Sequence, residues 1–197
     1  MNGFEKRAQL IKEKIKTTTL ELLHASGPER IRIADIAKAA HVSQVTLYNY
    51  FGSKEGLLRE VFKSYIDGAI RDFETYMNEG HSLKEKIEYI LFQKNEVLKE
   101  FPPRLIRELL LSDQELKHYL EEQYAQKSLP LTMRMIEEGK SSGEISEQVS
   151  TESVLALMRM YMSQYELMLS MAQQSLDMEK FLDGMLHLFF YGICGKE

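Results

Sequence analysis

Apolar residues recur every three or four positions along nearly the whole chain, and this spacing gathers them on one face of an α-helix. No stretch alternates apolar and polar residues as a half-buried strand does. The pattern therefore predicts an all-α protein of about nine helices. They cover residues 4–25, 33–40, 45–51, 56–77, 82–101, 103–111, 112–139 with a kink or restart at Pro130, 150–172 and 177–193.

Local signals mark several of the predicted helix starts. Ser82 with Glu85, and Ser112 with Glu115, have the three-residue spacing of a capping box, in which a hydroxyl and a carboxylate each accept a hydrogen bond from a free backbone N–H. Ser150 with Thr151 begins a long helix and Asp177 the last one.

Residues 31–58 predict two short helices joined by a tight turn. Ile36 and Ala40 share the inner face of the first helix, and Leu47 faces the core from the second. Ser43 lies where its hydroxyl caps the second helix. The second helix keeps a polar and aromatic outer face, which is the arrangement of a helix-turn-helix DNA reader.

The motif that begins at Asp35 makes this interpretation specific. It reads Asp-Ile-Ala-x-Ala-x-x-Val-Ser-x-x-Thr-Leu-Tyr-x-Tyr-Phe-x-Ser-Lys-Glu-x-Leu and resembles the signature of the tetracycline-repressor (TetR) family. The resemblance implies a three-helix DNA-binding domain over residues 1–55 and a larger helical domain for ligand binding and dimerisation over 56–197. It also implies a transcriptional repressor that a small-molecule ligand releases from its operator.

The chain departs from the family pattern at three positions. His41 stands where the family usually has glycine in the turn, and histidine tolerates a positive φ better than most residues. Arg32 replaces a frequent hydroxyl cap, so its expected contribution is charge toward a DNA phosphate. Val45 replaces a frequent glycine or alanine, so the operator preference does not follow from a relative.

The exposed start of the second short helix predicts the DNA contacts. Gln44 suits paired hydrogen bonds to adenine, and Val45 suits a thymine methyl group. The resemblance implies phosphate contacts by Tyr48, Tyr50 and Lys54, although Tyr50 equally suits packing beneath the helix. The full set of predicted DNA-binding residues is Arg32, Ser43, Gln44, Val45, Thr46, Tyr48, Asn49, Tyr50 and Lys54.

Charge is divided unevenly along the chain. Residues 1–62 hold ten Lys and Arg against seven Asp and Glu, a balance of +3, while the remainder holds fifteen against twenty-three, a balance of −8. The net charge of −5 disfavours a protein that binds DNA by bulk charge. The division instead suits a protein that touches phosphate with one end.

The last two predicted helices are too apolar for the surface of a monomer. Residues 154–172 are apolar nearly all round, which requires burial on more than one side. A homodimer built from two helices of each subunit satisfies this, and its two-fold axis would match a palindromic operator in double-stranded DNA. Burial within one subunit is the alternative. The predicted interface residues are Leu155, Met158, Met162, Leu169, Met185 and Phe189.

The larger domain is expected to hold a small-molecule effector whose identity the sequence does not give. Nine of the eleven methionines lie between Met133 and Met185, and their flexible side chains suit an adaptable apolar cavity or an ordinary core. The candidate polar residues of a pocket are Arg104, Arg107, His118, Tyr119, Arg134, Tyr161 and Tyr165.

Other classes of protein fit the sequence less well. The five histidines lack metal-site spacing, and Cys194 is the one cysteine, so no metal, cofactor or internal disulfide is expected. No nucleophile motif indicates an enzyme. No signal peptide or membrane span is expected, which makes the cytoplasm the default compartment. A helical protein–protein adaptor with a vestigial DNA-binding domain is the alternative function.

Overall fold

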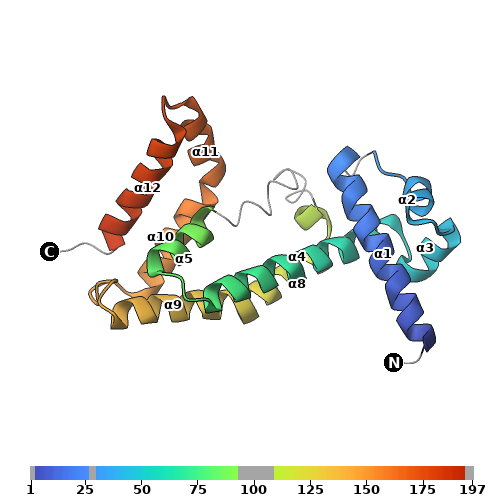
Figure 1. Ribbon diagram of the computed structural model, residues 1–197, viewed down its shortest axis with the longest axis horizontal. Helices are drawn as coiled ribbons and strands as arrows, with labels where there is room; N and C mark the ends of the chain where they lie inside the picture. Colours follow the sequence, from blue (N-terminus) through green and yellow to red (C-terminus); the bar gives the residue numbers. More distant parts are fainter. Residues whose placement is uncertain (1–2, 27–29, 93–108, 194–197) are drawn as a thin grey trace. The chain divides into compact units, whose positions relative to one another are not determined.

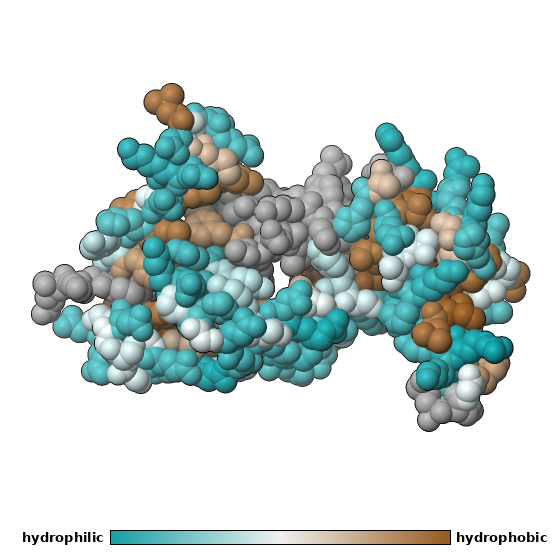
Figure 2. Space-filling view, viewed as in Figure 1, coloured by the Kyte–Doolittle hydropathy of each residue, from teal (hydrophilic) through white to brown (hydrophobic). Residues whose placement is uncertain are grey.

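The computed structural model describes residues 3–26, 30–92 and 109–193. Within these ranges every regular element is a helix, which confirms the all-α prediction (Figure 1). Contacts divide the chain into two compact units, residues 1–71 with 97–123 and residues 72–96 with 124–197. Polar side chains cover much of the face seen in Figure 2, with apolar side chains exposed in patches.

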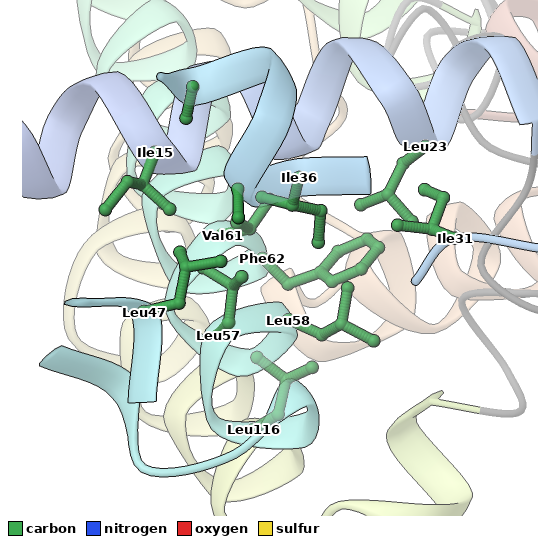
Figure 3. Packing of buried hydrophobic residues seen from close by; sticks show 12 residues of the cluster. Ile15, Leu23, Ile31, Ile36, Leu47, Leu57, Leu58, Val61, Phe62 and Leu116 are labelled. Carbon is green, nitrogen blue, oxygen red and sulfur yellow. The ribbon is translucent and has the colours of Figure 1, made fainter. Parts of the chain in front are cut away.

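The first unit is built around the helix-turn-helix segment. It contains α1 (Gly3–Ser26), α2 (Ile33–Ala40), α3 (Gln44–Phe51), the first part of α4 (Lys54–Asn78) and α8 (Gln114–Gln123). Figure 3 shows apolar side chains from these helices converging on one core. Its most deeply buried members are Ile15, Ile36, Ala40, Leu47 and Leu57.

The helix α8 extends this unit beyond the boundary predicted at residue 55. Its Leu116 is 2% exposed and belongs to the same core as Leu57 and Val61 of α4. The Arg59 guanidinium donates to Asp113 at 2.6 Å and to Glu115 at 2.7 Å. The first half of α4 therefore packs with the DNA-binding helices and with α8.

The start of α8 differs from the predicted capping box. Asp113, and not Ser112, caps the helix, because its carboxylate accepts from the Leu116 N–H at 3.0 Å. The Ser112 hydroxyl donates backward to the Leu109 carbonyl, and Glu115 is engaged with Arg59 and Lys63 instead. The ion pairs with Arg59 and Lys63 therefore occupy the Glu115 carboxylate, which a capping box with Ser112 would need.

The second unit has a separate apolar core. It contains the end of α4 together with α5 (Leu83–Phe92), the π-helical turn η2 (Tyr124–Ser128), α9 (Leu129–Ser141), α10 (Thr151–Ser163), α11 (Tyr165–Gln174) and α12 (Met178–Ile193). Ile87, Ile136, Ile145, Val154 and Phe189 are each at most 1% exposed in this core. Among the described residues no helix has both the length and the apolar character needed to cross a membrane.

Two predicted caps of this unit are confirmed. Ser82 accepts from the Glu85 N–H at 3.3 Å while the Glu85 carboxylate accepts from the Ser82 N–H at 2.7 Å. The hydrogen bonds from the Ser82 hydroxyl and N–H hold the pKa of Glu85 below its usual value. At the start of α10, Ser150 accepts from the Ser153 N–H at 3.1 Å.

Other helix limits differ from the prediction. The helix predicted over 150–172 ends at Ser163, because Gln164 leaves the helical region at φ −102° and ψ 12° before α11 begins. Pro130 lies in the first turn of α9, directly after η2. The wider π-helical turn of η2 suits Pro130, because proline has no backbone N–H to donate. The predicted limit at Phe101 and most of the helix over 103–111 lie outside the described residues.

Candidate nucleic-acid interface

The turn between α2 and α3 has a left-handed residue at its centre. His41 has φ 56° and ψ 46°, and it is the one non-glycine residue with positive φ in the described chain. The following Val42 N–H donates to the Ala37 carbonyl at 3.0 Å, which closes the end of α2. Histidine thus occupies the glycine position of the turn, as the sequence predicted.

The start of α3 is fixed by the predicted cap. The Ser43 hydroxyl accepts from the Thr46 N–H at 3.0 Å and lies 2.9 Å from the Thr46 hydroxyl. This satisfies one of the free N–H groups of the first turn. Both hydroxyls are therefore engaged in holding the helix, and the remaining hydrogen-bonding capacity of Ser43 faces solvent because that residue is exposed.

The two faces of α3 differ sharply. Leu47 is 1% exposed and anchors the helix on the core of the first unit. On the opposite side Val45 is 66% and Tyr48 50% exposed, and Gln44 and Asn49 are exposed as well. The sequence places two hydrogen-bonding amides, one methyl-bearing side chain and one phenol on a single solvent-facing surface, and we call these four residues the reading surface.

The other predicted DNA-binding residues lie around this surface. Arg32 is exposed one residue before α2, where its backbone N–H donates to the Asp35 carboxylate at 3.3 Å. Lys54 is half-buried in the first turn of α4. Tyr50 is half-buried against the core, so part of its ring packs beneath the helix.

The junction between α3 and α4 depends on Ser53 of the family motif and on two glycines, Gly52 and Gly56, that the sequence did not mark as functional. Gly52 ends α3 with φ +73°, and the Ser53 hydroxyl accepts from the Gly56 N–H at 3.0 Å. A Cβ on Gly56 would lie 2.2 Å from the Phe51 carbonyl oxygen. The spacing Gly-Ser-x-x-Gly after an aromatic residue was the available signal for this close approach.

The predicted pocket residues do not form one described cluster. Arg104, Arg107 and the Tyr165 side chain lie outside the described residues. In the first unit His118 is exposed, and Tyr119 donates to Asp67 at 2.5 Å. Burial and this hydrogen bond raise the pKa of Tyr119 to about 12.

Two further pocket candidates belong to the second unit. Arg134 is exposed on α9 and donates to the Asn78 side-chain oxygen at 2.6 Å. Tyr161 is half-buried on α10, where its ring meets Phe189 edge-on at a centroid distance of 5.1 Å. Burial raises the pKa of the Tyr161 phenol. No described hydrogen bond joins these two side chains.

The predicted dimer residues separate into two groups. Met158 and Phe189 are 2% and 1% exposed, so their own subunit covers them and they are core residues rather than surface contacts. Leu155, Met162, Leu169 and Met185 are half-buried. The apolar side chains that α10 to α12 leave most exposed are Met160, Leu167, Met171, Leu188 and Tyr191.

The capped recognition helix, its solvent-facing amides and its packing on α1, α2 and α4 define a helix-turn-helix DNA-binding protein. Residues 15–61 match the family described as "Bacterial regulatory proteins, tetR family". Over these residues, which include α2, α3 and the start of α4, the chain is similar to this family of transcriptional regulators. The family match lies within the first unit, where the reading surface is formed.

Similarity to known proteins extends over nearly the whole chain. The chain is 25% identical over 186 residues to the "Fatty acid metabolism regulator protein" of Bacillus subtilis (strain 168), covering 93% of this chain and 95% of the relative. The structure of the regulator FadR from Bacillus subtilis in complex with stearoyl-CoA has a TM-score of 0.59 and 22% identity, covering 94% of this chain and 99% of that one.

The same fold also occurs in a protein with a different description. The crystal structure of superantigen PfiT has a TM-score of 0.67 and 17% identity, covering 90% of this chain and 95% of that one. These structural likenesses establish the shared fold. A shared fold does not determine function, which depends on the residues at the site.

Proposed function

We propose that this protein is a transcriptional repressor that binds a palindromic operator as a homodimer and leaves it when a small-molecule effector binds. The observation that carries the DNA-binding part is the reading surface, because Gln44 and Asn49 present amides beside the exposed side chains of Val45 and Tyr48. Amides and methyl groups are the groups that distinguish base edges in the major groove. A protein with this function works in the cytoplasm, where the chromosomal DNA lies.

The proposed effector carries a long acyl chain. Support comes from the Bacillus subtilis relative, which is named as a regulator of fatty acid metabolism, and from the related structure, which holds stearoyl-CoA. The methionine-rich stretch from Met133 to Met185 offers flexible apolar side chains that suit such a ligand. An effector that binds only one arrangement of the two DNA-binding domains shifts the population toward that arrangement.

A fluorescence-anisotropy titration tests the DNA-binding part. The labelled probe is the intergenic DNA beside the protein's own gene, with a random duplex of equal length for comparison at near-physiological salt. We expect a preference of about a thousandfold or more for the intergenic DNA, with whole dimers bound per site. Equal, salt-sensitive binding to both duplexes would contradict sequence-specific recognition.

The effector is tested on the preformed complex. Stearoyl-CoA is titrated into protein bound to the intergenic probe, with acetyl-CoA and free coenzyme A as matched controls. We expect release by stearoyl-CoA alone, because the controls share the polar group and lack the long chain. Release by all three compounds would assign recognition to the coenzyme, and release by none would contradict a long-chain acyl effector.

A further inference from the structure

Lys12 on α1 lies beside the recognition helix rather than beside a carboxylate. Its ammonium nitrogen is 5.5 Å from the centre of the Tyr50 ring. Tyr50 follows Asn49 of the reading surface and packs its ring against the core of the first unit. The contact therefore places a positive charge of α1 at the edge of α3.

Lys16, the neighbouring lysine on the same side of α1, has polar partners within the protein, unlike Lys12. Lys16, one turn further along, donates to the Ser64 hydroxyl at 2.7 Å and pairs with Glu13 at 2.9 Å. Gln9 donates to Glu13 as well, at 2.6 Å. No ion pair joins Lys12 to a carboxylate in the described parts of the chain, so the Tyr50 ring is its described electrostatic partner.

An ammonium group held on an aromatic ring without an anion is suited to receive one. Lys12 is half-buried and its ammonium already lies over the Tyr50 ring, so less side-chain conformational entropy is lost when the ammonium binds. A lysine ammonium has three N–H donors and a point charge, and it can donate a charge-assisted hydrogen bond to a phosphate oxygen. The chemical partner at the edge of a DNA-reading helix is the phosphate backbone.

We propose that Lys12 is a further DNA-phosphate contact, held in position by the ring of Tyr50. This inference rests on the proposed DNA-binding function and extends the interface from α3 and α4 to α1. Lys12 contributes affinity on any sequence and positions α3, whereas the reading surface distinguishes sequences.

The test compares Lys12→Met with Lys14→Met in the full-length protein. Lys14 lies on the same helix, about 200° round from Lys12, and is exposed, so both substitutions remove one charge from α1. The affinity for the intergenic probe and for the random duplex is measured at several salt concentrations. Lys12→Met should lower the slope of log affinity against log salt by about two for a dimer with two DNA-binding domains. Lys14→Met should leave the slope unchanged.

The affinity loss of Lys12→Met should be equal on both duplexes, and Lys12→Arg should restore the wild-type slope. A lower melting temperature for Lys12→Met and Lys12→Gln with an unchanged salt slope would overturn the proposal, because Lys12 would then only support the fold. Equal decreases for Lys12→Met and Lys14→Met would overturn it too, because bulk charge would explain both. The salt slope can be measured on random DNA alone. Failure of the Lys12 proposal is therefore distinguishable from failure of the proposed function, in which the wild-type protein would show no preference for the intergenic DNA.

Discussion

Gln44 and Tyr48 both lie on the reading surface, and their side chains suit different contacts with DNA. The Gln44 amide is suited to paired hydrogen bonds with a base edge, whereas the Tyr48 phenol is suited to a phosphate. Tyr48 is half-exposed and Gln44 is exposed, so neither supplies core packing that its removal would disturb. Differences in DNA binding between variants at these two positions therefore report on contacts with DNA.

We predict that Gln44→Ala mainly relaxes base preference. The affinity for operator DNA should fall by about 1–3 kcal/mol, while the affinity for random duplex stays near that of the wild type. Tyr48→Ala should weaken binding to both duplexes by a similar factor. Anisotropy titrations measure both effects, with Gln148→Ala, an exposed glutamine of the second unit, as the control. Equal losses on both duplexes for Gln44→Ala would remove its assigned role.

Gly56 is predicted to be required for the junction of α3 with α4. A Cβ at this position would meet the Phe51 carbonyl oxygen at 2.2 Å, and backbone atoms cannot move aside at low cost. Gly56→Ala should lower the free energy of unfolding by about 1–3 kcal/mol, despite the better helix propensity of alanine. Urea denaturation followed by circular dichroism measures this change.

Gly68 provides the matched control in the same helix. A Cβ there would meet only the end of the Arg71 side chain, at 3.9 Å. Gly68→Ala should therefore raise the free energy of unfolding by up to about 1 kcal/mol. If both variants were stabilised, the close approach at Gly56 would not constrain the fold.

The contact of α4 with α8 depends on Asp113. The Asp113 carboxylate caps α8 and receives the Arg59 guanidinium, and its side chain is 14% exposed. Burial alone raises the pKa of Asp113, but hydrogen bonds from the Leu116 N–H and from Arg59 outweigh it and hold that pKa below its usual value of 3.8. The charged form is therefore favoured in the folded protein.

This lowered pKa makes stability depend on acid in a defined direction. The unfolded chain binds the Asp113 proton more readily, so the contribution is complete above about pH 4 and is lost as the pH falls through the lower folded pKa. Asp113→Asn keeps a capping side chain but cannot titrate. We predict that its free energy of unfolding varies less with pH below about 4 than that of the wild type. Parallel acid dependences would show that Asp113 is not responsible.

Comparing Asp113→Ala with Asp113→Asn separates the cap from the charge. Asp113→Ala removes both, and we expect a loss of about 1–2 kcal/mol of unfolding free energy at neutral pH from the cap alone. Asp113→Asn should lose less. Denaturant titrations of the two variants at neutral pH make the comparison, and equal losses would assign the whole effect to the ion pair with Arg59.

Local chemistry explains which elements could be predicted from the sequence. The prediction of a helix-turn-helix over residues 31–58 depends on short-range signals: the apolar spacing of α2, the Ser43 cap and the tolerance of His41 for positive φ. The structure has all three. The cap by Asp113 was not predicted because it depends on distant residues. Arg59, 54 positions before Asp113, and Lys63 pair with Glu115, so this carboxylate does not complete the capping box with Ser112. The break at Gln164 was missed as well, since no glycine or proline marks it.

In the candidate site, too, local patterns predict some features and leave others undetermined. Burial of Leu47 and exposure of Gln44, Val45, Tyr48 and Asn49 follow from helical periodicity. Periodicity cannot tell which apolar residues of a helix face their own subunit, because core and interface residues are chemically alike. Met158 and Phe189 were therefore assigned to a dimer interface although they are core residues.

The exposed apolar side chains of the second unit suit contact with another protein surface. Leu167 is 57% and Leu188 65% exposed on α11 and α12, two helices that lie against each other (Figure 1). Figure 2 shows apolar side chains at the surface of this part of the unit. Exposed apolar patches mark interaction sites, and a second copy of the chain is the partner that the proposed palindromic operator requires.

We predict that the wild-type protein is a dimer in size-exclusion chromatography with light scattering, and that Leu167→Lys combined with Leu188→Lys makes it a monomer. Lysine places a charge where the partner's apolar surface would cover it, and burying an unpaired charge is costly. Leu111→Lys is the control, because Leu111 is 71% exposed in the first unit.

Dimer loss should also change DNA binding in a way that a folding defect would not. Each separated subunit keeps its reading surface, so binding to random duplex should persist with about half the salt slope. The preference for operator should fall steeply, because the second half-site no longer binds as part of the same molecule. A monomeric double variant with undiminished operator preference would mean that one reading surface suffices, and the two-fold operator would then have no structural basis in this protein.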